Sequence, residues 1–132
     1  MAFENQQINI TIQASAALTD LRAGLGELYK AVGTTGDVTG DDDLAIGILT
    51  QGADDAGHAG ICVFGVCKYV ADGAVTNGQG LTVTTSGYMT AATSGGHCVG
   101  RNLISAVASG AVGTGIFNFA NPFALVNSNG NL

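Results

Sequence analysis

The chain has 132 residues, of which 46% are hydrophobic and 11% are charged, a composition that argues against disorder and predicts one domain with its own core. Its 10 acidic and 4 basic residues give a net charge of -6 at pH 7, and Arg22, Lys30, Lys68 and Arg101 are scattered singly. Direct nucleic-acid binding is therefore disfavoured, because it needs several cations on one face to displace counterions from phosphates.

The first predicted element is a strand near the start of the chain. The stretch QQINITIQAS places Ile8, Ile10 and Ile12 in alternation with polar residues, the period-2 pattern of a half-buried strand. The residues before it include Glu4 and no cationic region followed by an apolar core. No signal peptide is expected.

A short helical turn is predicted next. Between residues 16 and 32, apolar residues recur at spacings of three and four, which favours an amphipathic helix. Gly24 and Gly26 oppose a long helix, because each costs about 1 kcal/mol in a helix interior. The pattern predicts a helical turn near residues 19–24 and a strand over about residues 27–32.

The remainder of the chain has a β pattern, with short apolar runs separated by turns at roughly ten-residue spacing. The runs are LAIGILT, ICVFGVCKYV, LTVTT, YMTAA, CVGRNLISAV and GIFNFA. Short strands joined by glycine-rich turns are typical of a small barrel or sandwich. The glycines are expected in those turns, where positive φ angles are needed.

The three cysteines are an odd number without paired spacing, so free thiols and synthesis in a reducing compartment are expected. In an extended strand, Cys62 and Cys67 would point to opposite faces about 16 Å apart. A disulfide needs Cα atoms within about 7 Å, so the two are expected neither to bridge nor to share a metal. Together with His58, His97 and Cys98 they match no zinc spacing, and buried cysteines acting as small hydrophobes are expected.

No other motif indicates chemistry. The acidic run over residues 37–43 lacks the spacing of a calcium loop and is predicted to be a solvated turn. No GxxxxGK[ST] phosphate loop occurs. Residues 102–132 carry no charge, but glycines, asparagines and Pro122 interrupt them, whereas a membrane span needs about 20 predominantly apolar residues. We therefore predict no catalytic site, metal, cofactor or membrane association, and no enzyme activity.

Three stretches occur in an order that is informative: DLRAGLGELYKAV at 20–32, LAIGILTQGADDAGHAGICVFGVCKYVADGAVTNGQGLTV at 44–83, and SGYMTAATSGGHCVGRNLISAVASGAVGTGIF at 86–117. In this order and spacing the chain resembles the small capsid cement, or head decoration, proteins of tailed bacteriophages. No single stretch is specific, but the order and spacing together are. Asn102 departs from the small residue usual in the family, and the tail is longer than is typical.

The resemblance implies a mainly β fold: a small single-domain β-barrel or β-tulip-like fold with one short helical turn and extended termini. Residues 1–18 would form an N-terminal arm or strand, 19–120 the decoration barrel and 121–132 a tail. It also implies a structural virion protein, made in the host bacterial cytoplasm, that binds the major capsid protein on the outer capsid surface and stabilises the expanded shell. A homotrimer is expected, with a dimer as the alternative.

Two segments are candidate interfaces under this resemblance. Residues 5–14 are either an internal strand of the domain or an arm that adds to an edge strand of the coat protein, with Ile8, Ile10 and Ile12 filling pockets. In the tail, Phe123 is a candidate aromatic anchor, because aromatic residues are enriched at interfaces.

The phenylalanines before Phe123 and the tyrosines leave further alternatives open. Phe117 and Phe119 share one strand face and are equally consistent with a core position. The alternative function is a carbohydrate-binding or adhesin-like β module on the virion surface. That function needs an exposed aromatic platform, for which Tyr29, Tyr69 and Tyr88 are the candidates besides phenylalanine.

Overall fold

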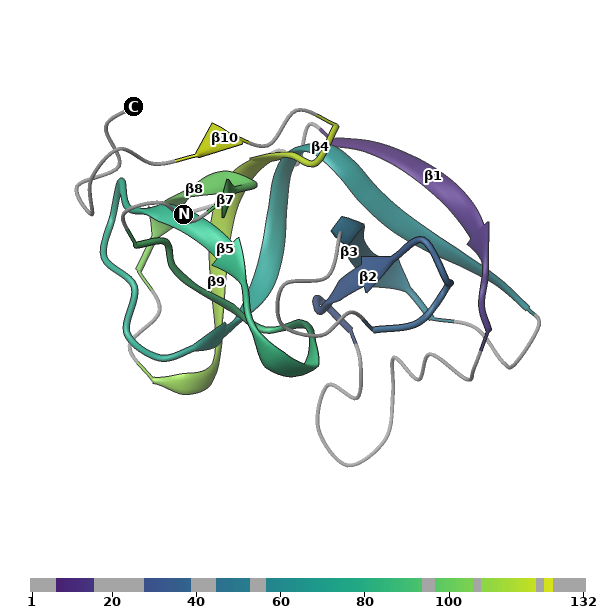
Figure 1. Cartoon of the computed structure of the whole chain (residues 1–132), viewed down its shortest axis with the longest axis horizontal. Coiled ribbons are helices and arrows are strands. Elements are labelled where there is room, and N and C mark those ends of the chain that lie inside the picture. Colours follow the sequence, from purple (N-terminus) through teal and green to yellow (C-terminus); the bar gives the residue numbers. More distant parts are fainter. Residues whose placement is uncertain are drawn as a thin grey trace.

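The computed structural model describes residues 7–15, 28–38, 45–52, 57–93, 97–105, 108–120 and 123–124. These residues form strands and one 3-10 turn, with no α-helix among them (Figure 1). The elements are β1 (Gln7–Gln13), β2 (Ala31–Gly33), β3 (Ala45–Gln51), β4 (His58–Asp72), β5 (Gly80–Val83), the turn Thr85–Gly87, β6 (Met89–Ala91), β7 (His97–Cys98), β8 (Gly100–Ile104), β9 (Ser109–Asn118) and β10 (Phe123–Ala124). The prediction of a mainly β fold is confirmed.

Two elements predicted for the first part of the chain are not seen as predicted. The helical turn expected near residues 19–24 lies outside the described residues. The strand expected over about residues 27–32 begins only at Ala31. Tyr29 has a φ of 65°, a left-handed conformation that is incompatible with a strand, so extended backbone starts after it.

The centre of the molecule is a closed five-stranded β-barrel. The hydrogen-bonded order is β4–β6–β5–β8–β9, and β9 pairs back onto β4. All of these pairings are antiparallel except the short contact between β4 and β6. Closure leaves no free edge among these five strands, so the barrel is a rigid support for whatever its surface carries.

The long strand β4 joins the barrel to a smaller group of strands (Figure 1). Its first half pairs with β1 on one edge and β3 on the other, so that Cys62 lies opposite both Asn9 and Ile48. Its second half pairs with β9 over Phe64 to Asp72. The strand β2 extends the group by pairing with β3.

Glycines inside strands make room for the aromatic side chains of the barrel core. Tyr69 lies opposite Gly113 on β9, and Phe117 lies opposite Gly65 on β4 and Gly100 on β8. Both rings are fully buried, and they meet edge to face with centroids 5.9 Å apart. A Cβ atom at Gly113 would lie 2.5 Å from the Tyr69 ring. A large residue beside a glycine on the neighbouring strand fills the barrel without overpacking it.

This arrangement corrects the expectation that glycines lie in turns. Gly36, Gly78, Gly87 and Gly110 do have positive φ angles outside regular strands or at a strand end. Others, such as Gly113, lie in the middle of strands because a side chain there would overlap an aromatic ring. Periodicity alone does not distinguish the two uses.

A second hydrophobic cluster is formed by residues of β2, β3 and β4 and by Ala14, which follows β1. It contains the buried residues Ala14, Val32, Leu49, Ala59 and Ile61, with Ile12 packed against it. Burial of each large aliphatic side chain there stabilises the fold by about 1.5 to 3 kcal/mol. Within the ranges given above, no helix is both long and apolar enough to cross a membrane.

Candidate functional site

The residues that the sequence offered for metal or nucleophilic chemistry are not brought together. His58 is exposed at the start of β4, whereas Cys98 is buried on β7. Across the described ranges, no three His, Cys, Asp or Glu residues gather as potential metal ligands. The Asp37 carboxylate accepts a hydrogen bond from the backbone N–H of Val38 at 2.7 Å, as in a turn that satisfies itself locally.

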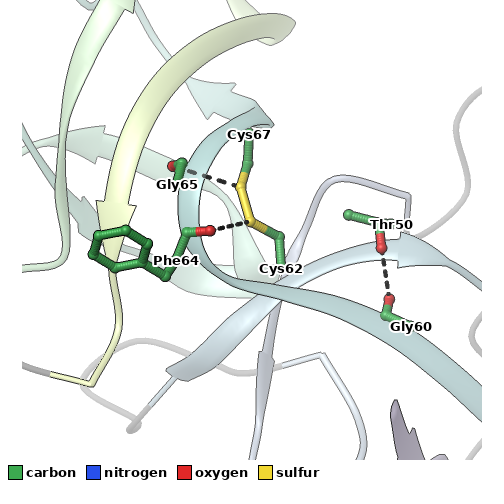
Figure 2. Close-up of a disulfide and its surroundings, with 6 residues drawn as sticks. All are labelled: Thr50, Gly60, Cys62, Phe64, Gly65 and Cys67. Atoms are coloured by element: carbon green, nitrogen blue, oxygen red, sulfur yellow. Dashed lines mark hydrogen bonds between the residues drawn. A yellow bond between two sulfur atoms is a disulfide. The ribbon is translucent and has the colours of Figure 1, made fainter. Parts of the chain in front are cut away.

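The expectation that Cys62 and Cys67 cannot bridge is wrong, because the two form a disulfide across a bend in β4 (Figure 2). Their Cα atoms lie 6.8 Å apart, within the range that a disulfide can span. Each sulfur also lies 3.7 Å from a carbonyl oxygen in the bend, that of Phe64 for Cys62 and that of Gly65 for Cys67.

A β-bulge explains why strand alternation fails here. Phe64 and Cys62 pair with the consecutive residues Ile8 and Asn9 of β1, so Val63 is an extra residue on β4. Because Val63 does not count in the alternation of side chains, Cys62 and Cys67 project to the same side of the strand. Gly65 then bends the strand with a φ of 111°, a backbone angle that residues other than glycine rarely adopt. This bend shortens the distance between the two cysteines.

The disulfide predicts a thiol count. In denaturant without reductant, we expect one thiol per chain to react, that of Cys98, and after reduction all three cysteines should react. Denaturant is needed because Cys98 is buried. Burial also raises the pKa of its thiol, against smaller opposing effects of Arg101 and a backbone hydrogen bond with Leu81. Three reactive thiols before reduction would contradict the bridge.

A buried hydrogen-bonded pair links β4 and β8. The Tyr69 hydroxyl donates a 2.7 Å hydrogen bond to Asn102 Oδ1, and Asn102 Nδ2 donates to the carbonyl oxygen of Thr76 at 3.0 Å. The backbone of Asn102 bonds to Gly78 and Gln79 in the same connection between β4 and β5. Asn102 is 1% exposed. Asn102 therefore clamps this connection to β8.

Alkaline pH should destabilise the protein through Tyr69. Burial raises the pKa of its hydroxyl from 10.0 to about 12, so between these values the unfolded chain releases a proton that the native state keeps. The free energy of unfolding is unaffected by this group below pH 10 and should fall by about 1.4 kcal/mol per pH unit above it. Urea unfolding of the wild type and of Tyr69→Phe from pH 9 to 11.5 measures the difference, and equal slopes would contradict it.

The outer side of the barrel carries a face with apolar and cationic side chains, which we call the outer face. Residues directly opposite each other in an antiparallel pair project to the same side. Three neighbouring rungs of the β8–β9–β4–β1 pairing define the face: Ile8, Phe64 and Asn118; Val66, Ile116 and Arg101; Lys68 and Thr114.

Three of the apolar members of the outer face are exposed, and Val66 is half-buried. Ile8 is 59% exposed, Phe64 49% and Ile116 47%. A pocket of 330 Å³ opens between Phe64, Ile116 and Arg101, with Val99 and Asn118 also in its wall. An exposed apolar patch on a soluble domain is a common mark of an interaction site.

The predicted interface residues have different positions in the structure. Ile8 lies on the outer face, Ile10 is also exposed, and Ile12 is half-buried against the second cluster. The segment that contains them is β1, a strand of the domain's own sheet. Their role at an interface stays a prediction.

Of the tail phenylalanine, Phe123, the structure describes only the backbone. Phe123 pairs with Cys98 in the two-stranded sheet of β10 and β7, and its side chain lies outside the described part of the structure. Phe117 and Phe119 are buried and stack with centroids 5.5 Å apart, so the core alternative holds for both.

Sequence reasoning missed Phe64 and Ile116. Each lies in a run that is apolar at consecutive positions, so period-2 alternation gives no sign of which residues face outward. The available signal was the pair Gly113 and Gly115, two positions apart in GAVGTGIF. These glycines mark the inner side of β9 and leave Ile116 on the outside.

The tyrosines offer no open platform for a sugar ring. Tyr69 is fully buried. The ammonium of Lys68 lies over the ring of Tyr29, 5.6 Å from its centroid, and that of Lys30 lies 5.2 Å from the centroid of Tyr88. Cations over the rings occupy faces that a carbohydrate would need.

Comparison with known proteins gives a structural likeness. No protein-family model matches the chain, and no curated protein matches its sequence. Among solved structures, the chain is similar to the head fiber gp8.5 N base of bacteriophage phi29, with a TM-score of 0.64 over 86% of this chain and 96% of that chain. The two sequences are 11% identical. This likeness establishes the fold, and it does not single out the cement family.

Proposed function

We propose that the chain is a structural bacteriophage protein that binds the outer surface of the capsid and stabilises the expanded shell. The fold likeness to a phage head fiber base carries this proposal, because it extends over nearly the whole of both chains. The order of sequence stretches that resembles capsid cement proteins points to the same part of the virion and does not depend on the fold likeness.

The architecture suits a binding role that needs no turnover. A closed barrel presents its surface without a change of shape, so binding orders few groups and costs little conformational entropy. In a homotrimer, which we propose as the assembly, each contact after the first is intramolecular, so modest contacts with the major capsid protein add up to high avidity.

A capsid-retention assay tests the proposal. Purified protein is mixed with unexpanded and expanded capsids of the phage that encodes it, and the bound fraction is measured by co-sedimentation. We expect saturable binding to expanded capsids and a higher temperature of capsid disruption when they are decorated. Absence of retention would reject the capsid function. Binding to a glycan array in its place would favour a carbohydrate-binding module.

The contribution of β1 is better tested by point substitution than by deletion. Removal of residues 1–14 would take a paired strand out of the sheet, so loss of binding could reflect loss of the fold. Ile10→Ser changes a side chain that is 43% exposed and leaves the strand backbone in place. Unchanged capsid retention would remove Ile10 from the candidate interface.

A further inference from the structure

We infer that the outer face binds an apolar, acidic segment of the coat protein, an inference that rests on the proposed capsid function. The face combines three features in one place: exposed apolar side chains, a pocket, and cations at its border. Each of them restricts the chemistry of the occupant.

The first feature is the set of exposed apolar side chains, which a rigid part of the sheet supports. Phe64 and Ile116 project from β4 and β9, which are paired over eight matched positions with one irregularity, between Val70 and Asp72. Beneath them, Phe117 and the glycines opposite it fill the barrel. The apolar side chains are therefore held in place before any partner arrives, which limits the entropy lost on binding.

The second feature is the pocket. The pocket has a volume of 330 Å³ and lies between the aromatic side chain of Phe64 and the aliphatic side chain of Ile116. Arg101 and Asn118 are polar groups at its border. Such a pocket suits one large apolar side chain of a partner, the kind of anchor that dominates binding energy at protein interfaces. The polar groups at its border can bind the partner's backbone or a neighbouring carboxylate.

The third feature is the sign of the charge. Lys68 and Arg101 are two of the four cations of a chain with net charge -6, and both lie on this face. The acidic residues within the described ranges are Asp37 and Asp72, and neither belongs to the three rungs. A cationic border in an acidic protein favours a partner that presents carboxylates beside its apolar anchor.

The same charges argue against a second copy packed face to face. Such a symmetric contact would place Lys68 and Arg101 of one copy near those of the other, and like charges at an interface are unfavourable. The coat protein is therefore the occupant that we commit to, and self-association is an outcome that the experiment can detect.

Two pairs of matched variants test the inference in the capsid-retention assay with the full chain. Ile116→Ser removes an apolar side chain from the pocket, and Val112→Ser removes one that is 40% exposed on the same strand but lies beyond the three rungs. Lys68→Glu reverses a cation at the border of the face. Lys30→Glu reverses a lysine that likewise lies over a tyrosine ring but does not belong to the three rungs.

We expect Ile116→Ser and Lys68→Glu each to weaken retention about tenfold or more, the scale of an interface hot spot. Both controls should bind like the wild type. Wild-type retention should weaken with salt, and Lys68→Glu should reduce that dependence. Native mass and thermal unfolding are measured for every variant, so that loss of the fold is recognised.

The outcomes separate the inference from the function on which it rests. If the wild type is retained and the two face variants bind equally well, the outer face is not the contact, and the capsid function stands. Equal losses from Val112→Ser or Lys30→Glu would also overturn the assignment to this face. A lower oligomer mass for Ile116→Ser would assign the face to contacts between copies. If the wild type itself is not retained, both proposals fail.

Discussion

Replacing Gly113 with alanine is expected to lower the free energy of unfolding by about 3 kcal/mol, which corresponds to a fall in Tm of roughly 10 °C. The added Cβ would lie 2.5 to 2.7 Å from three atoms of the Tyr69 side chain. The ring has little room to move, because its hydroxyl is held by Asn102 and its edge meets Phe117.

The control for this substitution is Gly73→Ala. A Cβ at Gly73 would meet nothing within 4 Å, so its replacement should change stability by less than about 0.5 kcal/mol. In a Tyr69→Leu background, Gly113→Ala should cost much less than in the wild type, because the clashing ring is gone. Thermal and urea unfolding of the wild type, the three single variants and the double variant provide the measurement. Equal effects of Gly113→Ala in both backgrounds would show that the ring is not the cause.

Replacing Asn102 with leucine should destabilise the protein by about 2 to 4 kcal/mol. The substitution removes the acceptor of the buried Tyr69 hydroxyl and the donor to the Thr76 carbonyl. A buried polar group without a partner costs about 1 to 3 kcal/mol, and the connection between β4 and β5 would lose its clamp as well.

An exposed hydrogen bond between the same two segments serves as the control. The Ser105 hydroxyl donates to Asn77 Oδ1 at 2.8 Å in an exposed position, so Ser105→Ala should cost less than about 0.5 kcal/mol. The double variant Tyr69→Phe with Asn102→Leu should be less destabilised than the sum of its parts, because both members of the pair are then apolar. Urea unfolding measures all four variants. A strictly additive result would mean that the pair does not act as a unit.

The β class of the fold could be predicted from the sequence because it depends on local signals. The alternation of Ile8, Ile10 and Ile12 and the regular spacing of turns each report the backbone conformation of a few residues. These signals carry no information on which strands pair. The closure of the barrel by β9 against β4, between residues about fifty positions apart in the sequence, followed only from the structure.

The Cys62–Cys67 bridge shows why local periodicity was insufficient at the candidate site. Whether Val63 leaves the alternation is decided by its neighbours in space: Asn9 and Ile8 on β1 pair around it, and its carbonyl accepts a hydrogen bond from the backbone N–H of Phe119 at 3.2 Å. These partners are distant in sequence. A reading of β4 alone assumes a regular strand, which places the cysteines on opposite sides.

The outer face was unpredictable for a related reason. A run such as ICVFGVCKYV is apolar on both sides, since one side fills the barrel and the other contributes Phe64 and Val66 to the surface. Only the register with β9 and β8 shows that Arg101, Ile116 and Val66 form one rung. Strand topology, more than any motif, therefore brings the residues of the outer face together.

The pairing of aromatic residues with glycines also bears on how distant relatives of this barrel would differ in sequence. What each rung requires is a total side-chain volume, and this is met equally well when the large residue and the small one exchange strands. Positions such as Tyr69 and Gly113 would then vary together while neither is conserved alone. We therefore expect covariation across opposite strands, rather than identity at any one site, to mark this fold in sequence.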